Sequence, residues 1–406
     1  MEVLWRIYKT NVAPMIALLH KPSIESMLLE ARAKPTVDLE PESEVLIRAI
    51  LFAAIVSVIP LQCQAAVGYE HDACIQEYQL AVERSLTRAN LVSSNDVRVL
   101  QAAVLYLLCL RCVSDSRQVW AEAAIVVRVA QRQGIHRDGQ NLGLSPFDTE
   151  MRRRLWWHIC ILDMLCSEDQ GTDTQIHPGM FDTKPPRNID SDFLAPGLID
   201  LPPPQAGFTD ITLCIIQSEI MTSLAWTGKS FGSGSNPSSL QKEHEILPAL
   251  AAHLEDNFLR QLDLEDPVQW VIAVIARLTL SRASLISHLS NSASDRLSMA
   301  TDDESFNMAL EILEFVSLLQ NNDLSAQWAW IFKSYQQQHV VALILSELSA
   351  RPISSETDHA WDLVKAIYDG WQREKQNINS QLQEPLSLLM ERASISRMKK
   401  LNDAGL

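Results

Sequence analysis

Apolar residues recur at three- and four-residue spacing along most of the chain, which places them on one face of an α-helix. Between residues 97 and 111, for example, Val97, Leu100 and Val104 fall on one stripe with polar residues beside or opposite it. No segment shows the sustained alternation of apolar and polar positions that is typical of a half-buried strand. The pattern therefore predicts an all-α fold, a large multi-helix domain.

Several helix ends carry their own signals. Ser145 is followed by Pro146 and, three residues after the serine, by Asp148, an arrangement that favours the start of a helix. Gly134 and Gly171 follow the last residues of two helical patterns, where glycine commonly ends a helix. A more polar stretch closes the chain to residue 406. The expected helices span residues 45–59, 97–111, 115–133, 145–171, 209–226, 240–263, 267–290, 303–320, 325–349 and 356–378.

Two segments interrupt the helical pattern. Seven of the 18 prolines lie between Pro178 and Pro204, and because proline breaks helices and central strands we expect a long proline-rich loop over residues 178–208. Glycine and serine are concentrated in residues 228–239, which we interpret as a flexible linker. The linker would divide an N-terminal helical part, residues 1–227, from a C-terminal helical part, residues 240–406.

Composition narrows the class of protein. With 47% hydrophobic and 21% charged residues among 406, the chain is globular, and its 13 glycines are few for a turn-rich β fold. The net charge of -16 is unfavourable for contact with the phosphates of DNA. The most apolar stretch, residues 45–59, is too short for a membrane span, so we expect no membrane association and an intracellular location. The cysteines are scattered and are expected to be reduced thiols in the core: Cys63, Cys74, Cys109, Cys112, Cys160, Cys166 and Cys214.

Motifs for catalysis or cofactor binding are missing from the sequence, which contains no GxGxxG, no phosphate loop, no HExxH and no GxSxG. Cys109 and Cys112 form a CxxC pair inside a helical stripe, without the second pair that a structural zinc site requires. Asp302 and Asp303 lie in an acidic cluster, but the spaced aspartate of a terpene cyclase is absent. We predict no catalytic, cofactor-binding or metal-binding residues, and a helical enzyme or metabolite carrier stays as the alternative of another class.

Residues 152–157 read Arg-Arg-Arg-Leu-Trp-Trp within the helix that starts at Ser145, and Asp163 follows on the same helix. Arg152, Trp156 and Asp163 lie four and seven residues apart and share a stripe. Because a guanidinium can stack on an indole and pair with a carboxylate, we interpret the cluster as structural. Replacing Asp163 is then expected to leave a buried cation without its partner.

These segments resemble the regulatory, or middle homology, domain of the fungal zinc binuclear cluster transcription factors. Residues 131–138 and 144–157 are similar to the most recognisable part of that family, and residues 181–192 are similar to the segment that follows it. The resemblance extends over residues 1–371 and implies an all-helical domain that regulates transcription in the nucleus. The residues taken as the structural signature of the family are Arg152, Arg153, Arg154, Trp156, Trp157 and Asp163.

The sequence departs from that family in one respect. Its members usually bind DNA through an N-terminal cluster of six cysteines that holds two zinc ions, and no such cluster occurs here. The hypothesis is a regulator of a metabolic or secondary-metabolite gene set that has no DNA-binding residues of its own and acts through another transcription factor or a coregulator. A small-molecule effector in a cavity beneath the 178–208 loop is a further expected partner. The alternative within the same class is a fragment of a longer zinc-cluster factor.

Overall fold

The computed structural model describes residues 1–33, 39–114, 116–226, 237–292, 303–332, 337–374 and 380–404. Within these ranges all regular secondary structure is helical, which confirms the all-α prediction. Short π- and 3₁₀-helical turns join some of the α-helices. The α-helices are α1 Glu2–Ile7, α2 Lys21–Ala33, α3 Pro41–Val56, α4 Pro60–Val67, α5 His71–Arg88, α6 Val97–Leu110, α7 Ser116–Arg132, α8 Pro146–Gln170, α9 Thr212–Trp226, α10 Pro237–Asn257, α11 Pro267–Ser292, α12 Asp303–Asn321, α13 Ala329–Phe332, α14 Gln338–Ala350, α15 Ser355–Glu374 and α16 Ser380–Ala404.

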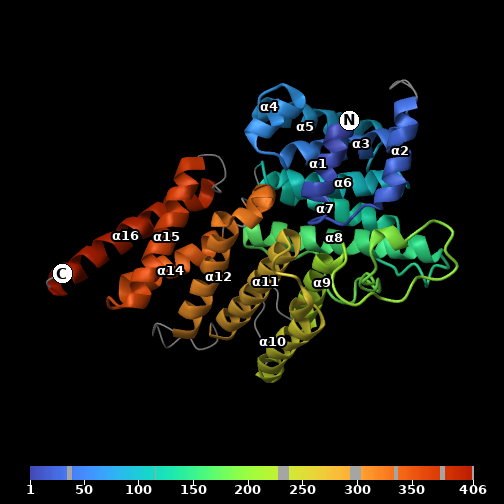
Figure 1. Ribbon diagram of the computed structural model, residues 1–406. Coiled ribbons are helices and arrows are strands. Elements are labelled where there is room, and N and C mark those ends of the chain that lie inside the picture. Colours follow the sequence, from blue (N-terminus) through green and yellow to red (C-terminus); the bar gives the residue numbers. More distant parts are fainter. Residues whose placement is uncertain are drawn as a thin grey trace.

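Helix α8 lies between the earlier and the later helices of the chain (Figure 1). It packs against α6 and α7 on one side and against α9 on another. Helix α9 also contacts α10 and α11, and α11 contacts α12, so that packing continues from α8 into the C-terminal half. The last helices, α14 to α16, form a group at the end of the molecule that carries the C-terminus (Figure 1).

The centre of the N-terminal half is the pair α3 and α6, which pack along each other. Phe52 of α3 contacts Tyr106 of α6, with their ring centroids 5.3 Å apart. The sequence predicted one buried stripe on α6, but Val99 and Leu105, off that stripe, are as fully buried as Leu100. The reason is position, because α6 also contacts α5, α7 and α8 and therefore has little surface facing solvent.

The predicted ends of the two helices before and after residue 140 are confirmed to within a residue or two. Helix α7 ends at Arg132, and Gly134 has a φ of 68°. Ser145 caps α8 by accepting a hydrogen bond from the amide of Asp148 at 3.0 Å, and Gly171 ends the helix with a φ of 65°. Because a positive φ is unfavourable for residues with a Cβ, glycine at both ends has a physical cause.

Near the C-terminus one prediction is wrong, and one helix was not predicted. The single helix expected over 325–349 is a 3₁₀ turn at Asp323–Trp328 followed by the separate helices α13 and α14. The polar end of the chain forms α16, which packs on α14. Among the residues of α16 whose burial is described, 384–402, Leu386 and Ala393 are the buried ones, and so narrow an apolar stripe makes the sequence pattern weak.

The predicted linker falls largely outside the described residues, which resume at Pro237, the first residue of α10. The division of the chain at 228–239 therefore stays a prediction. One stretch of α11, Pro267–Leu289, is long and apolar enough to cross a membrane by length and composition. In the fold 61% of its apolar window is buried, and Val271, Ile275 and Leu278 are fully enclosed, as expected of a core helix.

Candidate functional site

Arg153 forms a buried ion pair with Asp138, a residue of the connection between α7 and α8. Its Nε and Nη2 atoms donate to the two carboxylate oxygens at 2.8 and 2.9 Å. Asp138 also accepts from the backbone amides of Lys184, at 3.0 Å, and Gln140, at 3.1 Å. Burial alone would raise the pKa of Asp138, but these donors lower it below its usual value. The pair thus joins α8 to the connection before it and to the proline-rich loop after it.

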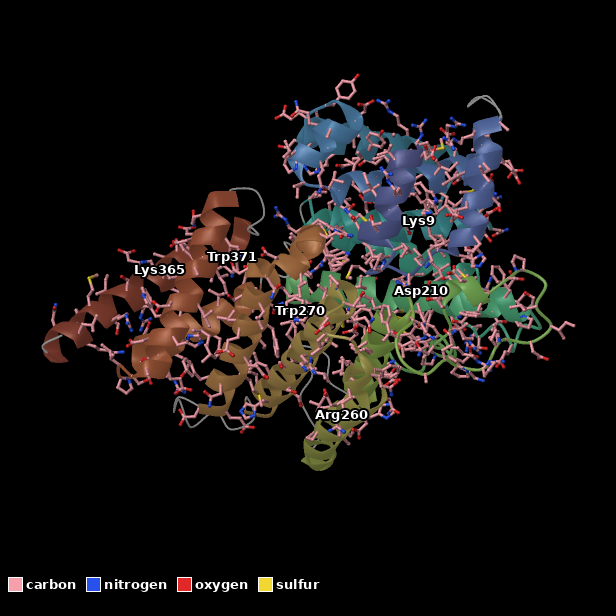
Figure 2. The ribbon with its side chains drawn as sticks, viewed as in Figure 1. Lys9, Asp210, Arg260, Trp270, Lys365 and Trp371 are labelled. Atoms are coloured by element: carbon pink, nitrogen blue, oxygen red, sulfur yellow. The ribbon has the colours of Figure 1, made fainter. Side chains whose placement is uncertain are left out.

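Arg154 is entirely buried and is directed at a later part of the same loop. It donates to the carbonyl oxygen of Ile189 at 2.6 Å and to the hydroxyl of Ser191 at 2.9 Å. Two acidic side chains lie close to its guanidinium, Glu150 at 3.5 Å and Asp210 at 3.4 Å. Asp210 lies beside α8, where the loop returns to the helices (Figure 2).

Glu150 lies between two of the arginines and is completely buried. Its oxygens are 3.5 Å from Arg154 and 4.0 Å from Arg153, and they accept from the amide of Arg187 at 3.2 Å. Burial raises the pKa of Glu150 to about 7, although Arg154, the Arg187 amide and Arg153 all act to lower it. Glu150 and Arg154 are four residues apart on α8, a spacing that brings oppositely charged side chains together on a helix.

The two tryptophans hold the start of the loop through Phe181. The ring centroid of Phe181 is 5.4 Å from that of Trp156 and 5.6 Å from that of Trp157. Trp157 also donates its indole N–H to the carbonyl oxygen of Lys184 at 2.9 Å. Trp156 is fully buried, so its large apolar surface contributes to the core as well as to the loop.

The predicted partner of Asp163 is wrong. Asp163 accepts hydrogen bonds from the amide of Ile176 at 2.9 Å and from the side chain of Gln175 at 3.3 Å, both just beyond α8. In the described part of the chain, the cations that lie over aromatic rings are Lys9 on Trp5, Arg351 on Phe306 and Arg397 on Trp361. No such contact of a cation with Trp156 occurs among these residues. Shared spacing on α8 does not bring Arg152 to Asp163, because each side chain meets a different neighbouring segment.

Polar side chains inside the loop complete its attachment. Asn188 donates to the carbonyl oxygens of Gln205 and Gly207, each at 2.8 Å, and accepts from the hydroxyl of Thr209 at 2.7 Å. Thr183 donates to the carbonyl oxygen of Ile135 at 2.9 Å. The loop therefore has a fixed course over α8, even though its only helical residues are the 3₁₀ turn Ser191–Phe193.

A pocket of about 900 Å³ opens at one edge of this loop. Its walls come from α2, α3, α6 and the first turns of α8, and residues 194–196 of the loop form one side. The pocket lies next to the loop and not beneath its whole length.

In the described ranges, no three histidine, cysteine or acidic side chains gather as they would around a metal ion. All seven cysteines are buried as free thiols.

The chain is similar in sequence to known proteins over most of its length. Residues 5–193 match the model of the fungal specific transcription factor domain. The chain is 30% identical over 373 residues to the aurofusarin cluster transcription factor aurR2 of Gibberella zeae, which covers 90% of this chain and 55% of that protein. Residues 5–193 of this chain are thus similar to the fungal specific transcription factor domain.

Other curated relatives match this chain over a similar length. The pyriculol/pyriculariol biosynthesis cluster transcription factor 1 of Pyricularia oryzae is 26% identical over 379 residues, 90% of this chain and 50% of the relative. The C6 finger domain transcription factor nscR of Aspergillus fumigatus is 26% identical over 388 residues, 90% of this chain and 48% of the relative. The chain thus spans about half the length of the relatives that it matches.

The sequence pattern did not identify the acidic partners of the buried arginines. Asp138 and Asp210 neutralise Arg153 and Arg154, yet they lie 15 and 56 residues away along the chain. Asp138 belongs to the block 131–138 that carried the family resemblance, which was the available signal. Nothing in the sequence pattern indicated Asp210, because it stands alone at the end of an irregular segment.

Proposed function

We propose that this chain is the regulatory part of a fungal transcription regulator and that it controls a secondary-metabolite gene set. The observation that carries the proposal is the similarity over 90% of the chain to proteins named as transcription factors of biosynthesis clusters. The match to the fungal specific transcription factor domain over residues 5–193 supports the same class. The domain then acts by binding other proteins in the nucleus and not by catalysis.

Contact with DNA is, in this proposal, supplied outside the described residues, by a partner factor or by a further segment. The net charge of -16 supports it, since binding to DNA depends on neutralising phosphates with lysine and arginine. Arg153 and Arg154, two of the three consecutive arginines, are buried and paired with carboxylates, so they are not exposed to phosphate. We propose that the signature residues instead fix the proline-rich loop on α8 and keep the surface around it rigid.

A reporter assay tests the regulatory role. The full chain is fused to an unrelated sequence-specific DNA-binding domain and expressed in a fungal host that carries a reporter gene behind the matching site. The fusion is expected to raise or lower transcription relative to the DNA-binding domain alone. A fusion carrying Asp138→Ala serves as the comparison, because loss of the buried pair is expected to reduce the effect. Transcription equal to that of the DNA-binding domain alone, with the fusion present in the nucleus, would contradict the proposal.

A binding assay tests whether the chain itself contacts DNA. The purified chain is expected to show no sequence-selective shift of promoter DNA at physiological salt, while the same chain mixed with its partner factor gives a shift. A nanomolar, sequence-selective shift by the purified chain alone would show that the chain contacts DNA itself.

A further inference from the structure

The pocket beside the proline-rich loop is large enough to hold a small molecule. Its volume of about 900 Å³ lies in the range of pockets that enclose drug-sized ligands. Apolar side chains from four different segments line it: Met27 of α2, Leu46 of α3, Phe147 and Met151 of α8, and Leu194 of the loop. A largely apolar wall of this kind favours a ligand with an apolar body.

Most polar side chains in the wall already have partners. His20 bonds through Nε2 to the carbonyl oxygen of Leu194 at 3.0 Å, so Nε2 carries the proton and Nδ1 accepts from the hydroxyl of Ser23 at 2.7 Å. Arg98 donates to Asp96 at 2.7 Å and to Ser43 at 2.8 Å. These groups position the walls and have little capacity left to bind a ligand.

Arg152 is the exception among the three consecutive arginines. Its side chain lines the pocket, and its guanidinium donates through Nη2 to the carbonyl oxygen of Gln133 at 2.8 Å. Its Nε is buried without a hydrogen-bond partner, and among the described residues no carboxylate oxygen lies within 4.0 Å of its nitrogens. Arg153 and Arg154, by contrast, each have a carboxylate within that distance.

Acidic groups also face this pocket and limit the ligands that it can accept. Asp148 lies one helical turn before Arg152 and accepts from the hydroxyl of Ser145 at 2.6 Å, while Glu40 is 3.3 Å from Arg98. Glu30 is exposed at the rim. A ligand with several negative charges would therefore meet repulsion, whereas one acidic group placed at Arg152 would gain a charge-assisted hydrogen bond.

We propose that this pocket binds an apolar organic acid, with the apolar body against Phe147, Met27 and Met151 and a single carboxylate on the guanidinium of Arg152. The ligand then contacts α2 and α8 at the same time, beside Leu194 of the loop in the same wall. This assignment goes beyond the proposed function, and it stands or falls on binding by the purified chain alone.

Calorimetric titration of the purified chain with 2-naphthoate and with its neutral analogue 2-naphthamide tests the assignment. Naphthoate is expected to bind saturably to one site and at least about tenfold more tightly than naphthamide, the factor expected for a hydrogen bond to a charged group. Arg152→Gln is expected to remove that tenfold difference by weakening naphthoate alone. Arg128→Gln is the matched control, because Arg128 is exposed on α7 and bonds only to Gln131 among the described residues.

A second pair of variants locates the binding without touching a charge. Ser26→Trp places a large ring at the pocket wall and is expected to weaken both compounds, whereas Leu29→Trp, on an exposed position of the same helix outside the pocket, is expected to change neither. The proposal is overturned if naphthoate shows no saturable binding up to about 1 mM, if Arg152→Gln and Arg128→Gln bind it alike, or if Ser26→Trp binds it as well as the natural chain. Should Arg152→Gln fail to fold, the tryptophan pair decides the matter alone.

Discussion

The buried pair of Arg153 and Asp138 offers the sharpest test of how the domain is held together. Asp138→Ala removes two hydrogen bonds to the guanidinium, at 2.8 and 2.9 Å, and the acceptor of the Lys184 and Gln140 amides. The side chain of Arg153 is 3% exposed, so solvent does not reach the charge that remains.

The size of the effect follows from burial. Removing one partner of a buried ion pair typically costs about 3–5 kcal/mol, because the other charge stays desolvated. Glu150 remains 4.0 Å from Arg153 and partly balances it, which favours the lower end of that range. Because the pKa of Asp138 is lowered in the fold, the pair stabilises fully above the unfolded value of about 4 and loses this contribution as pH falls through the folded value. At pH 7 the whole effect is therefore present.

Urea unfolding followed by far-ultraviolet circular dichroism measures the loss for Asp138→Ala, Arg153→Ala and the double variant. We expect the double variant to be far less destabilised than the sum of the single ones, with a coupling free energy of about 2 kcal/mol or more. Arg137→Ala is the matched control, since Arg137 is half exposed and 3.4 Å from Asp182, and it should cost less than about 1 kcal/mol. Additive single variants, or a loss in Arg137→Ala as large as in Asp138→Ala, would refute the reasoning.

Three further outcomes follow from the same region. Asp163→Ala removes the acceptor of the Ile176 amide and should lower the unfolding free energy by about 1–3 kcal/mol. Asp163→Asn keeps an oxygen that can accept from Ile176, so we expect a smaller loss. Equal losses of the two variants in urea titrations would point to a role for the charge of Asp163. Burial raises the pKa of Glu150 to about 7, so the natural chain becomes less stable as pH rises from about 4.5 to 7. The unfolding free energy of Glu150→Gln relative to that of the natural chain should therefore increase over this window by up to about 3 kcal/mol. A difference in unfolding free energy that does not change with pH would contradict this. Trp156→Ala leaves a cavity and should lower the unfolding free energy by about 3–5 kcal/mol. Because Phe181 packs against the indole, the variant should also be cleaved more readily by proteases within residues 178–208. A loop as resistant to proteases as in the natural chain would show that the position of Phe181 does not depend on the indole.

The sequence predicted the helices whose ends carry local signals. Ser145 and Gly171 mark the limits of α8 because a cap and a positive φ are decided by neighbouring residues. Helix α16 was missed because its burial depends on α14, a distant segment that no local pattern reports.

The sequence identified residues of the candidate site but not the acidic residues that pair with its arginines. The run of three arginines on one helix indicated that a cation is buried with a carboxylate partner, and the structure shows such pairs for Arg153 and Arg154. The pairing of Asp163 failed because the chain after α8 turns back and offers backbone amides to it. Such tertiary contacts depend on the course of an irregular loop, which spacing along a helix cannot supply.

Transcript levels across the genome of the source organism, compared with and without the gene for this chain, test the proposed role most directly. The account predicts that a contiguous set of biosynthetic genes changes together, and that restoring the gene restores their transcripts. Unchanged transcripts of every biosynthetic gene set, under conditions in which the protein is present in the natural strain, would contradict it.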